Sequence, residues 1–532
     1  MPPLNFSIIR QSTQLSSARR GTLAITHAVS ETAVVANTQT KSGFESTVRE
    51  SKKRVIETPG CLMYTAKGSV PHLTPDTMRL QSFGGASVSI EHVLQDYQPA
   101  GFEKFPFNLA TYLNLQDFIL LCDIRDTSKF VKVPFNSDRY VSMVTHQGVR
   151  QLTLEDYLKC VRTYEPDVLA SFSDFVSDLE PGQKRVRKSV DRSLKWLDQL
   201  LMERQGLDGL AQDREADMKK KENQKKNSGE ASSAKEPKET TPAPAAVTPK
   251  PWKDVGVFAH VLGSHIEDER IRSATETAKR DVEGFIIDAT SLAGSKDDVQ
   301  KLIKTSLDNL PSNKPKVVYG MQAPEDVLKS IALGVDLFDT SYPFVLTEDG
   351  KASLFSFGPE DSADAKDERI VEPRWINLWD EEHADKFVPL MTGCECYSCK
   401  GGKHTRAYIN HLLKTHEMLA TVLLMSHNMY QYSRFFENVR KSIEQDTFDQ
   451  YSQDFMARWG TEPERTGEIH PVAAMVEASL HKRNRLDDDA SSIASGQQAP
   501  KGKGEKKERV FVNKKEKRLK KQQEKLEKQP SQ

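Results

Sequence analysis

Short apolar runs alternate with amphipathic stretches along most of the chain. The run PDVLASFSD (166–174) follows the helix-like LTLEDYLKCVRTY, and VGVFAHV (255–261) precedes the helix-like EDERIRSATETAKR. The alternation continues through GFIIDA (284–289), KVVYGM (316–321), the helix-like PEDVLKSIALG, and VDLFD (335–339). Short apolar strands separated by amphipathic helices are typical of a parallel sheet covered by helices. The pattern therefore predicts an α/β fold, and eight such units would close into a (β/α)8 TIM-like barrel.

Three aspartates stand at the ends of these predicted strands. Asp174, Asp288 and Asp339 each close or follow an apolar run. In a (β/α)8 barrel the chemistry gathers at the carboxyl ends of the strands. The alternative is that each aspartate starts a loop or caps the next helix, which is common at such positions.

Overall charge and cysteine content narrow the class of protein. The 532 residues include 75 Lys and Arg against 76 Asp and Glu, so any basic surface for nucleic acid must be local. Six cysteines, three of them isolated, do not form the pattern of a secreted disulfide framework, which favours a reducing, intracellular setting. No apolar run approaches the ~20 residues that span a bilayer, so we expect no integral membrane segment.

The amino terminus allows two interpretations. The opening MPPLNFSIIRQSTQLSSARR carries Arg and Ser and no acidic residue, a composition typical of a mitochondrial transit peptide. The alternative is that NFSII forms a strand and a loop follows. We expect a cytoplasmic protein, with peripheral attachment at the mitochondrial outer membrane as the alternative.

Half of the cysteines crowd into one turn. Cys394, Cys396 and Cys399 form a Cys-x-Cys-x2-Cys motif. Tetrahedral Zn²⁺ would need one further ligand besides these three sulfurs. His404 lies close by in a Gly-rich turn, whereas His427 lies in the apolar helical run LATVLLMSH and shares its helix face with apolar residues. The motif predicts one zinc ion per chain, although free buried thiols are an alternative. Spacing alone leaves the choice between the two histidines open.

Composition also divides the chain. Residues 212–252 are rich in Lys, Glu, Ser, Ala and Pro and nearly free of large apolar residues, so they cannot offset their ordering entropy. The strongly basic end of the chain could fold on a phosphate backbone or be a solvated tail. We predict a first part of the barrel (1–211), a disordered linker insertion (212–252), a second part of the barrel (253–390), an inserted zinc-binding helical subdomain (391–440), C-terminal helices (441–484) and a disordered basic tail (485–532).

These motifs together resemble the tRNA-guanine transglycosylase family. The cysteine motif, followed by KHTRAYINHLL and MSHN, is similar to the family's zinc subdomain. The segments ARRGTL (18–23), IETPGCLMYTAKGSVPHLTPD (56–76) and YGMQAPEDVLKSIALGVDLFDTSYP (319–343) are similar to its opening strand, an early turn and helix start, and its last barrel units. Members are (β/α)8 barrels that exchange guanine at the anticodon wobble position for queuine or its precursor. The resemblance implies that the fourth zinc ligand is the helix histidine, here His427.

Several pocket motifs of the family are missing. Its catalytic acid-base aspartate lies in Thr-Asp-Ser-Gly-Gly-Phe-Gln, whereas the corresponding region here reads ILLCDIRDTSKF (119–130). The strand of the base-reading aspartate ends in SFSD, DATSLAGS (288–295) replaces a Gly-rich guanine loop, and VLGS (261–264) replaces Gln-Gly-Gly. Only the nucleophile's position is filled, by Asp339.

This combination resembles the accessory branch of the eukaryotic family. It implies a non-catalytic, zinc-containing subunit of a heterodimeric queuine tRNA-ribosyltransferase, with no catalytic or cofactor-binding residue apart from the zinc ligands. The implied partners are the catalytic subunit and tRNAs with GUN anticodons, in which position 34 is modified. The alternatives are an active transglycosylase with a diverged pocket and a zinc-stabilised RNA-binding scaffold.

Two surfaces near the zinc motif are candidates for binding these partners. Lys400, Lys403, Arg406 and Lys414 lie beside the cysteine turn and would face RNA phosphates, or would form an ordinary solvated face. A long helix expected from Arg406 to about Ser442 carries more apolar residues than one helix face needs. Part of it would contact the catalytic subunit, unless the barrel and the zinc site cover it.

Overall fold

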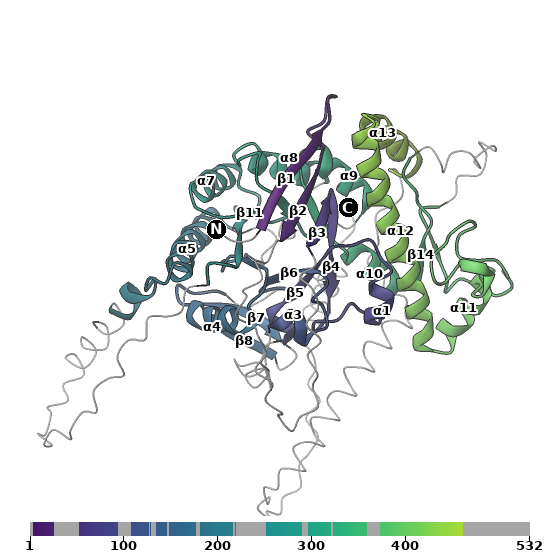
Figure 1. Cartoon of the computed structure of the whole chain (residues 1–532), viewed down its shortest axis with the longest axis horizontal. Coiled ribbons are helices and arrows are strands. Elements are labelled where there is room, and N and C mark those ends of the chain that lie inside the picture. The colour runs from purple at the N-terminus through teal and green to yellow at the C-terminus, as the bar shows by residue number, and fades with distance from the viewer. Residues whose placement is uncertain are drawn as a thin grey trace, which may run out of the picture. The chain divides into compact units, whose positions relative to one another are not determined.

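Eight parallel strands close into a barrel in the order β10-β11-β12-β13-β4-β5-β6-β9 (Figure 1). The strands are β4 (Gly60–Thr65), β5 (Gly85–Ser89), β6 (Ile119–Asp123), β9 (Val168–Ala170), β10 (Gly256–Val261), β11 (Gly284–Ile287), β12 (Lys316–Val318) and β13 (Leu337–Asp339). The barrel closes where β13 pairs with β4, with Leu337 opposite Gly60. The predicted (β/α)8 architecture is confirmed.

The computed structural model describes residues 4–25, 53–93, 108–126, 128, 135–145, 148–176, 181–215, 219, 252–289, 296–320, 323–358 and 373–460. All of them belong to one unit, Met1–Gly467. Of the predicted linker, only 212–215, 219 and 252 are among them. The predicted basic tail and the predicted C-terminal helices beyond residue 460 lie outside the described residues, so the domain boundaries stay predictions.

The barrel strands are buried on both faces, which explains their nearly continuous apolar sequences. On β6, Ile119 and Leu121 belong to the core inside the barrel, while Leu120 and Cys122 belong to the core between the barrel and its helices. Successive side chains of a strand point to opposite faces, so a strand between two apolar layers needs apolar residues at every position.

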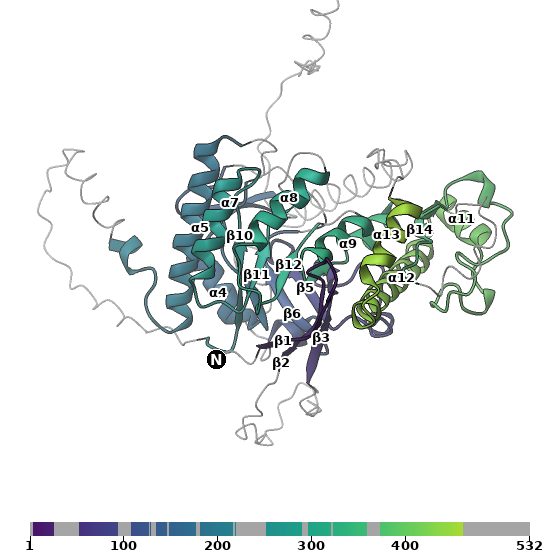
Figure 2. The same cartoon turned by 90° about the horizontal axis from the view of Figure 1, so that it is seen from above.

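Helices cover the outside of the barrel (Figure 2). They are α4 (Leu154–Tyr164), α5 (Gln183–Arg204), α7 (Glu267–Ala278), α8 (Lys296–Leu307), α9 (Pro324–Ala332) and α10 (Ser341–Glu348). As predicted from PEDVLKSIALG, α9 has Pro324 in its first turn and is followed by Gly334, whose φ of +98° favours glycine. Shorter elements complete this part: α1 (Pro75–Met78), α2 (Ile90–Val93), α3 (Leu109–Tyr112) and the hairpin β7 (Tyr140–Thr145) and β8 (Gly148–Thr153).

A three-stranded antiparallel sheet covers the amino-terminal end of the barrel. Its strands are β1 (Leu4–Gln11), β2 (Arg19–Ile25) and β3 (Arg54–Thr58), and β3 leads directly into β4. Leu23, Ile25 and Ile56 share one core with the inward-facing residues of the barrel strands. NFSII lies within β1, the strand that the second interpretation of the amino terminus predicted.

The C-terminal part contains a second, smaller core. Its elements are β14 (Lys351–Ser353), β15 (Trp375–Asn377), the 3-10 helices η3 (Glu381–His383) and η4 (Lys400–Gly402), α11 (Arg406–Lys414), α12 (Met418–Glu444) and α13 (Phe448–Trp459). In both views α12 lies between the barrel and α11 (Figures 1 and 2). Met425 and Met429 of α12 join the barrel core, whereas Leu423 and Leu424 join the core that holds the three cysteines of the motif. Among the described residues, no helix is long and apolar enough to cross a membrane.

The prediction of one long helix from Arg406 to about Ser442 is wrong, because the helix is interrupted. α11 ends at Lys414, and His416 takes a left-handed φ of +58° before α12 begins at Met418. The amide of Glu417 donates to Leu412 O at 2.9 Å, which turns the chain back between the two helices. Glycine and asparagine usually signal such a turn, and neither is present here.

Candidate metal centre and barrel mouth

The cysteine motif and His427 meet in the core of the C-terminal part. The cysteines lie in the turn that leads to η4, and His427 lies on α12. The four ligand atoms are within 4.8 Å of one another, and all four residues are buried. His427 Nδ1 lies 3.6, 3.5 and 3.4 Å from the Sγ atoms of Cys394, Cys396 and Cys399.

These distances fit a tetrahedral metal ion. With metal–sulfur bonds of about 2.3 Å and a metal–nitrogen bond of about 2.0–2.1 Å, the sulfur-to-nitrogen edge of a tetrahedron is about 3.6 Å. His427 Nε2 donates to Ser353 O of β14 at 2.8 Å, which leaves the Nδ1 lone pair facing the sulfurs. The four side chains could therefore hold a metal ion in the positions that they already occupy.

Two hydrogen bonds to sulfur surround this cluster. The side-chain amide of Gln431, one helical turn after His427, donates to Cys394 Sγ at 3.0 Å. The backbone amide of Cys399 donates to Cys396 Sγ at 3.3 Å. Donors to thiolates fix the orientation of metal ligands and reduce their negative charge. Gln431 is thus the side chain that links the metal site to the next turn of α12.

His404 is not part of the cluster. Its ring lies between the rings of Tyr397 and Tyr408, with centroid distances of 6.2 and 5.9 Å. Spacing left the choice between His404 and His427 open because the structure brings together residues 28 positions apart, Cys399 and His427.

At the carboxyl end of the barrel strands, neighbouring residues donate hydrogen bonds to the Asp339 carboxylate. Asp339 ends β13 and is 3% exposed. One carboxylate oxygen accepts from the amide of Gly320 at 3.1 Å, and the other accepts from the amide of Ser341 at 3.0 Å and from the Ser341 hydroxyl. Donors that stabilise the ionised carboxylate also lower its nucleophilicity.

A buried ion pair crosses the inside of the barrel near this end. His260 shares the inner face of β10 with Phe258, and its Nε2 lies 3.2 Å from Asp123 Oδ2 at the end of β6. Its Nδ1 lies 2.9 Å from Ser171 O. Burial lowers the pKa of His260, but the charge of Asp123 and the hydrogen bonds to Asp123 and Ser171 raise it above its ordinary value overall. The raised pKa favours the charged imidazolium of His260, which is the form that pairs with Asp123.

The segment after β6 belongs to the stretch ILLCDIRDTSKF (119–130), which lacks the family's Gly-rich catalytic string. There Arg125 donates to Ser142 O of β7 at 3.0 Å, and its guanidinium lies 5.5 Å from the centroid of the Phe175 ring. Burial lowers the pKa of Arg125, and the charges of Glu91 and Asp123 oppose this shift. A large cationic side chain is thus fixed directly after β6, at the carboxyl end of the barrel strands.

Asp174, the strand-end aspartate of SFSD, is fully buried and saturated. Its Oδ1 accepts from Asn136 at 2.7 Å and from Arg185 at 2.6 Å. Its Oδ2 accepts from Arg185 at 2.8 Å and from Arg192 at 2.9 Å. A carboxylate offers roughly four lone-pair sites, and four donors occupy them here. The side chain anchors α5 and is not available to read a base.

Arg270 of α7 braces the turn after β10 and the residue that follows β11. It is fully buried and donates from Nε to Ser264 O at 2.6 Å and from its guanidinium to Asp288 O at 2.7 Å. Gly263, with φ of +135°, lies so close that a Cβ there would be 2.6 Å from Arg270 N. The turn is shaped by packing against Arg270.

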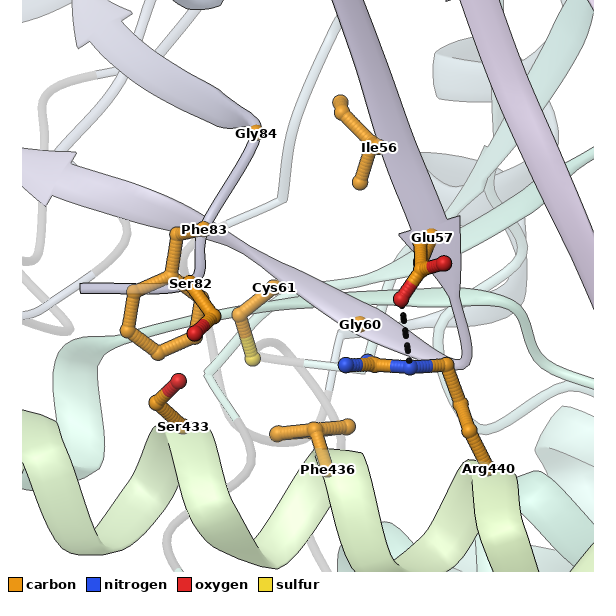
Figure 3. Close-up of a pocket in the computed structure, with 10 residues that line it drawn as sticks. All are labelled: Ile56, Glu57, Gly60, Cys61, Ser82, Phe83, Gly84, Ser433, Phe436 and Arg440. Atoms are coloured by element: carbon orange, nitrogen blue, oxygen red, sulfur yellow. Dashed lines mark ion pairs between the residues drawn. The ribbon is translucent and has the colours of Figure 1, made fainter.

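A small pocket lies at the opposite end of the barrel (Figure 3). Arg440 of α12 reaches into it, 3.3 Å from Glu57 and donating to Pro59 O at 2.8 Å. Because this pocket lies at the amino ends of β4 and β5, it is separate from the strand ends where barrel chemistry takes place. It is lined by Ile56, Glu57, Gly60, Cys61, Ser82, Phe83, Gly84, Ser433, Phe436 and Arg440.

The predicted basic cluster beside the cysteine turn is partly neutralised. Arg406 donates to Leu390 O at 2.9 Å and so supports the preceding loop. Lys414 lies 2.8 Å from Glu381, and Lys400 lies 3.4 Å from Glu395. These contacts favour the interpretation of an ordinary surface over that of a phosphate site.

The predicted apolar surface is smaller than expected: of the apolar residues on the predicted long helix, Tyr408, Met418 and Leu419 are the exposed ones. Most of α12 is covered, including Met425 and Phe435. Further exposed apolar residues lie in the loop before the cysteine turn and in that turn itself. We call the exposed residues together the metal-side patch: Phe387, Val388, Tyr397, Tyr408, Met418 and Leu419.

Sequence reasoning missed four residues of these sites. The alternation in VGVFAHV could have placed His260 on the inner face with Phe258. Arg125, Arg270 and Gln431 act through partners on other elements, for which the local sequence carries no signal.

Known proteins are similar to this chain over most of its length. A family model described as Queuine tRNA-ribosyltransferase matches residues 14–461. A Danio rerio protein named queuine tRNA-ribosyltransferase accessory subunit 2 is 30% identical over 437 residues, which cover 77% of this chain and 94% of the relative. Relatives of the same name from Homo sapiens and Drosophila mojavensis are 30% and 25% identical over 431 and 422 residues, covering 75% and 78% of this chain and 92% and 89% of the relatives. The resemblance is confirmed: the chain belongs to the queuine tRNA-ribosyltransferase family.

Proposed function

We propose that this chain is the zinc-containing accessory subunit of a heterodimeric queuine tRNA-ribosyltransferase. It binds a catalytic subunit and tRNAs with GUN anticodons, and it supports the replacement of guanine 34 by queuine without carrying out the exchange. Family membership and the accessory-subunit names of the relatives support this role.

The non-catalytic part of the proposal rests on the carboxyl ends of the barrel strands, which we call the barrel mouth, because their aspartates are already bound by other side chains. Base exchange needs a free carboxylate to attack, a second group to move protons and a pocket that reads the purine. Asp174 has four donors on its carboxylate, and Asp123 is paired with His260. Asp339 keeps the nucleophile's position, but these two aspartates do not provide its partners.

The metal in this proposal is one Zn²⁺ held by Cys394, Cys396, Cys399 and His427. Three thiolates and one imidazole at tetrahedral distances favour zinc over the oxygen-seeking cations. With four protein ligands the site has no open position for a substrate, so the ion would supply folding energy and no chemistry. It would join the cysteine turn to α12 and, through the His427 bond to Ser353, to β14.

The metal-side patch is the surface that we assign to the catalytic subunit. Phe387 is 79% exposed and Met418 is 83% exposed, which is unfavourable for large apolar side chains on an isolated subunit. Interface cores are enriched in aromatic residues and Met, as this patch is. A related barrel could dock here through a pseudo-twofold arrangement.

The proposed location is the cytoplasm. Cys61, Cys122 and Cys160 are buried free thiols, which suits a reducing compartment. Fractionation of cells should place the protein in the cytosol, or at the outer mitochondrial surface if the alternative holds.

Reconstitution tests the proposed function. The purified chain, the catalytic subunit and the mixture are assayed for incorporation of labelled queuine into tRNA, and we expect full activity only in the mixture. Asp339→Asn in this chain should leave the activity of the mixture nearly unchanged, while the equivalent change in the catalytic subunit should abolish it. If Asp339→Asn stops exchange in a complex that still forms and binds tRNA, this chain is an active transglycosylase with a diverged pocket.

A further inference from the structure

One face of helix α5 packs on the barrel and the opposite face is basic and exposed. One side faces the carboxyl end of β9, where Arg185, Ser189 and Ser193 all bond to Asp174. These residues are four positions apart, so they form one face of the helix. The helix is therefore fixed in rotation, and the opposite face is turned away from the barrel.

The outward face is strongly basic. Between Gln183 and Lys195 the sequence has six cations and one acid, Asp191, and two of the cations, Arg185 and Arg192, are bound to Asp174. Arg272 of α7 lies 2.7 Å from Asp191, and Lys195 lies 2.6 Å from Asp213. Three exposed cations are left, Lys184, Arg187 and Lys188, for which no ion pair appears within the described part of the chain. We call these three residues the α5 cations.

The start of the helix adds to this positive potential. The first turn of α5 contains no acidic residue, and its N-cap, Gly182, provides no side-chain hydrogen bond. The first turns of α4, α7 and α9 all contain acidic residues. Cations at a helix start lie next to the positive end of the helix dipole, an arrangement that is unfavourable until an anion binds.

The α5 cations fit RNA phosphates better than the basic cluster predicted beside the cysteine turn. Residues 380–417, which surround that turn, contain six acids and five Lys or Arg. Lys400, Lys414 and Arg406 are already engaged there by Glu395, Glu381 and Leu390 O. The outward face of α5, by contrast, has a large excess of positive charge.

We propose that Lys184, Arg187 and Lys188 bind phosphates of the tRNA backbone. The proposal rests on the proposed function, which brings tRNA to the complex, and names the surface that contacts it. Charge complementarity favours a phosphate backbone, because the three exposed side chains lie on one helix face and the apolar residues of the same turns, Val186 and Val190, are buried. In both views α5 and α11 lie on opposite sides of the barrel (Figures 1 and 2), so RNA can occupy this face while the metal-side patch is covered.

The test compares two charge-matched triple variants in complex with the catalytic subunit. One carries Lys184→Ala, Arg187→Ala and Lys188→Ala. The control carries Lys400→Ala, Lys403→Ala and Lys414→Ala. Affinity for an unmodified tRNA transcript with a guanine at position 34 is measured by fluorescence anisotropy between 50 and 200 mM salt.

Each lost phosphate contact should lower the salt slope by about 0.7–0.9. If the α5 cations make three contacts, the affinity of the wild-type complex should fall roughly 20- to 40-fold more over this salt range than that of the α5 variant. The control variant should keep the wild-type slope. The contacts to Asp174 are untouched in both variants, so α5 keeps its anchor.

Several outcomes would overturn the assignment. Equal slopes for the α5 variant and wild type would remove it, and a lower slope for the control alone would return the RNA site to the cysteine turn. Loss of catalytic-subunit binding by the α5 variant with unchanged RNA affinity would make this face a protein interface. Failure of the wild-type chain to pair with a catalytic subunit would instead refute the proposed function, and the same titration on the chain alone would still test the α5 cations.

Discussion

Substitution of the strand-end aspartate Asp174 tests most directly whether this residue stabilises the fold or reads a base in a diverged pocket. We consider Asp174→Asn, which keeps the size of the side chain and removes its charge. The asparagine retains one acceptor oxygen and places an NH2 group where a carboxylate oxygen accepted hydrogen bonds. The guanidiniums of Arg185 and Arg192 would then lose their shared anion.

The size of the effect follows from burial. The Asp174 side chain is 0% exposed, and those of Arg185 and Arg192 are 22% and 15% exposed. Removing one partner of a buried ion pair costs about 3–5 kcal/mol, because the remaining charges stay desolvated. Arg192 keeps its second partner, Asp138, so the lower end of this range, about 3 kcal/mol, is expected.

Thermal unfolding of the full chain, followed by circular dichroism, measures this loss. For a domain of roughly 400 residues the unfolding entropy is about 0.8 kcal/mol per kelvin, so the midpoint should fall by about 4 °C. Asp191→Asn on the same helix is the matched control. Its pair with Arg272 is 56% and 33% exposed, and such surface pairs contribute about 0–1 kcal/mol.

A base-reading aspartate would behave in the opposite way. Residues kept for binding are often held at a cost in stability, so their removal leaves stability unchanged or raises it. An Asp174→Asn chain that is as stable as wild type, or more stable, would refute the structural role and would revive the diverged-pocket alternative.

Three further predictions concern the metal site and the buried histidine. His427→Ala should remove the bound zinc measured by elemental analysis, whereas His404→Ala should keep it; the reverse result would show that the ligand assignment is wrong. Gln431→Leu should keep the metal but weaken its affinity about 10- to 100-fold in a chelator competition, as removal of an outer hydrogen bond to a ligand does, and an unchanged affinity would leave Gln431 without a role at the site. Because the folded pKa of His260 is raised, its contribution to stability is fully present below the unfolded value of about 6.5 and is lost as pH rises through the folded pKa. The stability difference between wild type and His260→Gln, from denaturant unfolding at several pH values, should therefore shrink above about pH 6.5, and a difference that grows with pH would contradict the ion pair with Asp123.

The period of the apolar residues was enough to predict the barrel because its strands are buried on both faces. VDLFD and GFIIDA read as continuous apolar runs, and they form β13 and β11. The interruption between α11 and α12 was not predictable in the same way, since a left-handed His416 has no glycine to announce it. Local patterns specify which residues are buried more directly than they specify where a helix turns.

The site residues likewise differ in whether local sequence predicts them or only the folded structure brings them together. The cysteine motif predicted a metal site, because three cysteines in one turn are typical of zinc ligands. The choice of His427 needed the fold, or the family resemblance, since its distance from the cysteines is set by how α12 packs. The neutralised mouth was invisible to sequence patterns, because the saturation of Asp174 by Arg185 and Arg192 exists only after α5 has docked on β9.

The closure of the barrel between β4 and β13 has a consequence for synthesis in the cell. Gly60 and Leu337 are paired neighbours in the sheet, yet at about 5–20 residues per second a ribosome would make Leu337 roughly 14–55 s after Gly60. During that time the nascent half-barrel has an unpaired β4 edge and apolar faces that its later helices have not yet covered. Such non-local pairing folds slowly and exposes the chain to aggregation. Substitutions that weaken the β4–β13 seam should therefore lower the yield of protein in cells more than they lower the stability of the molecules that finish folding.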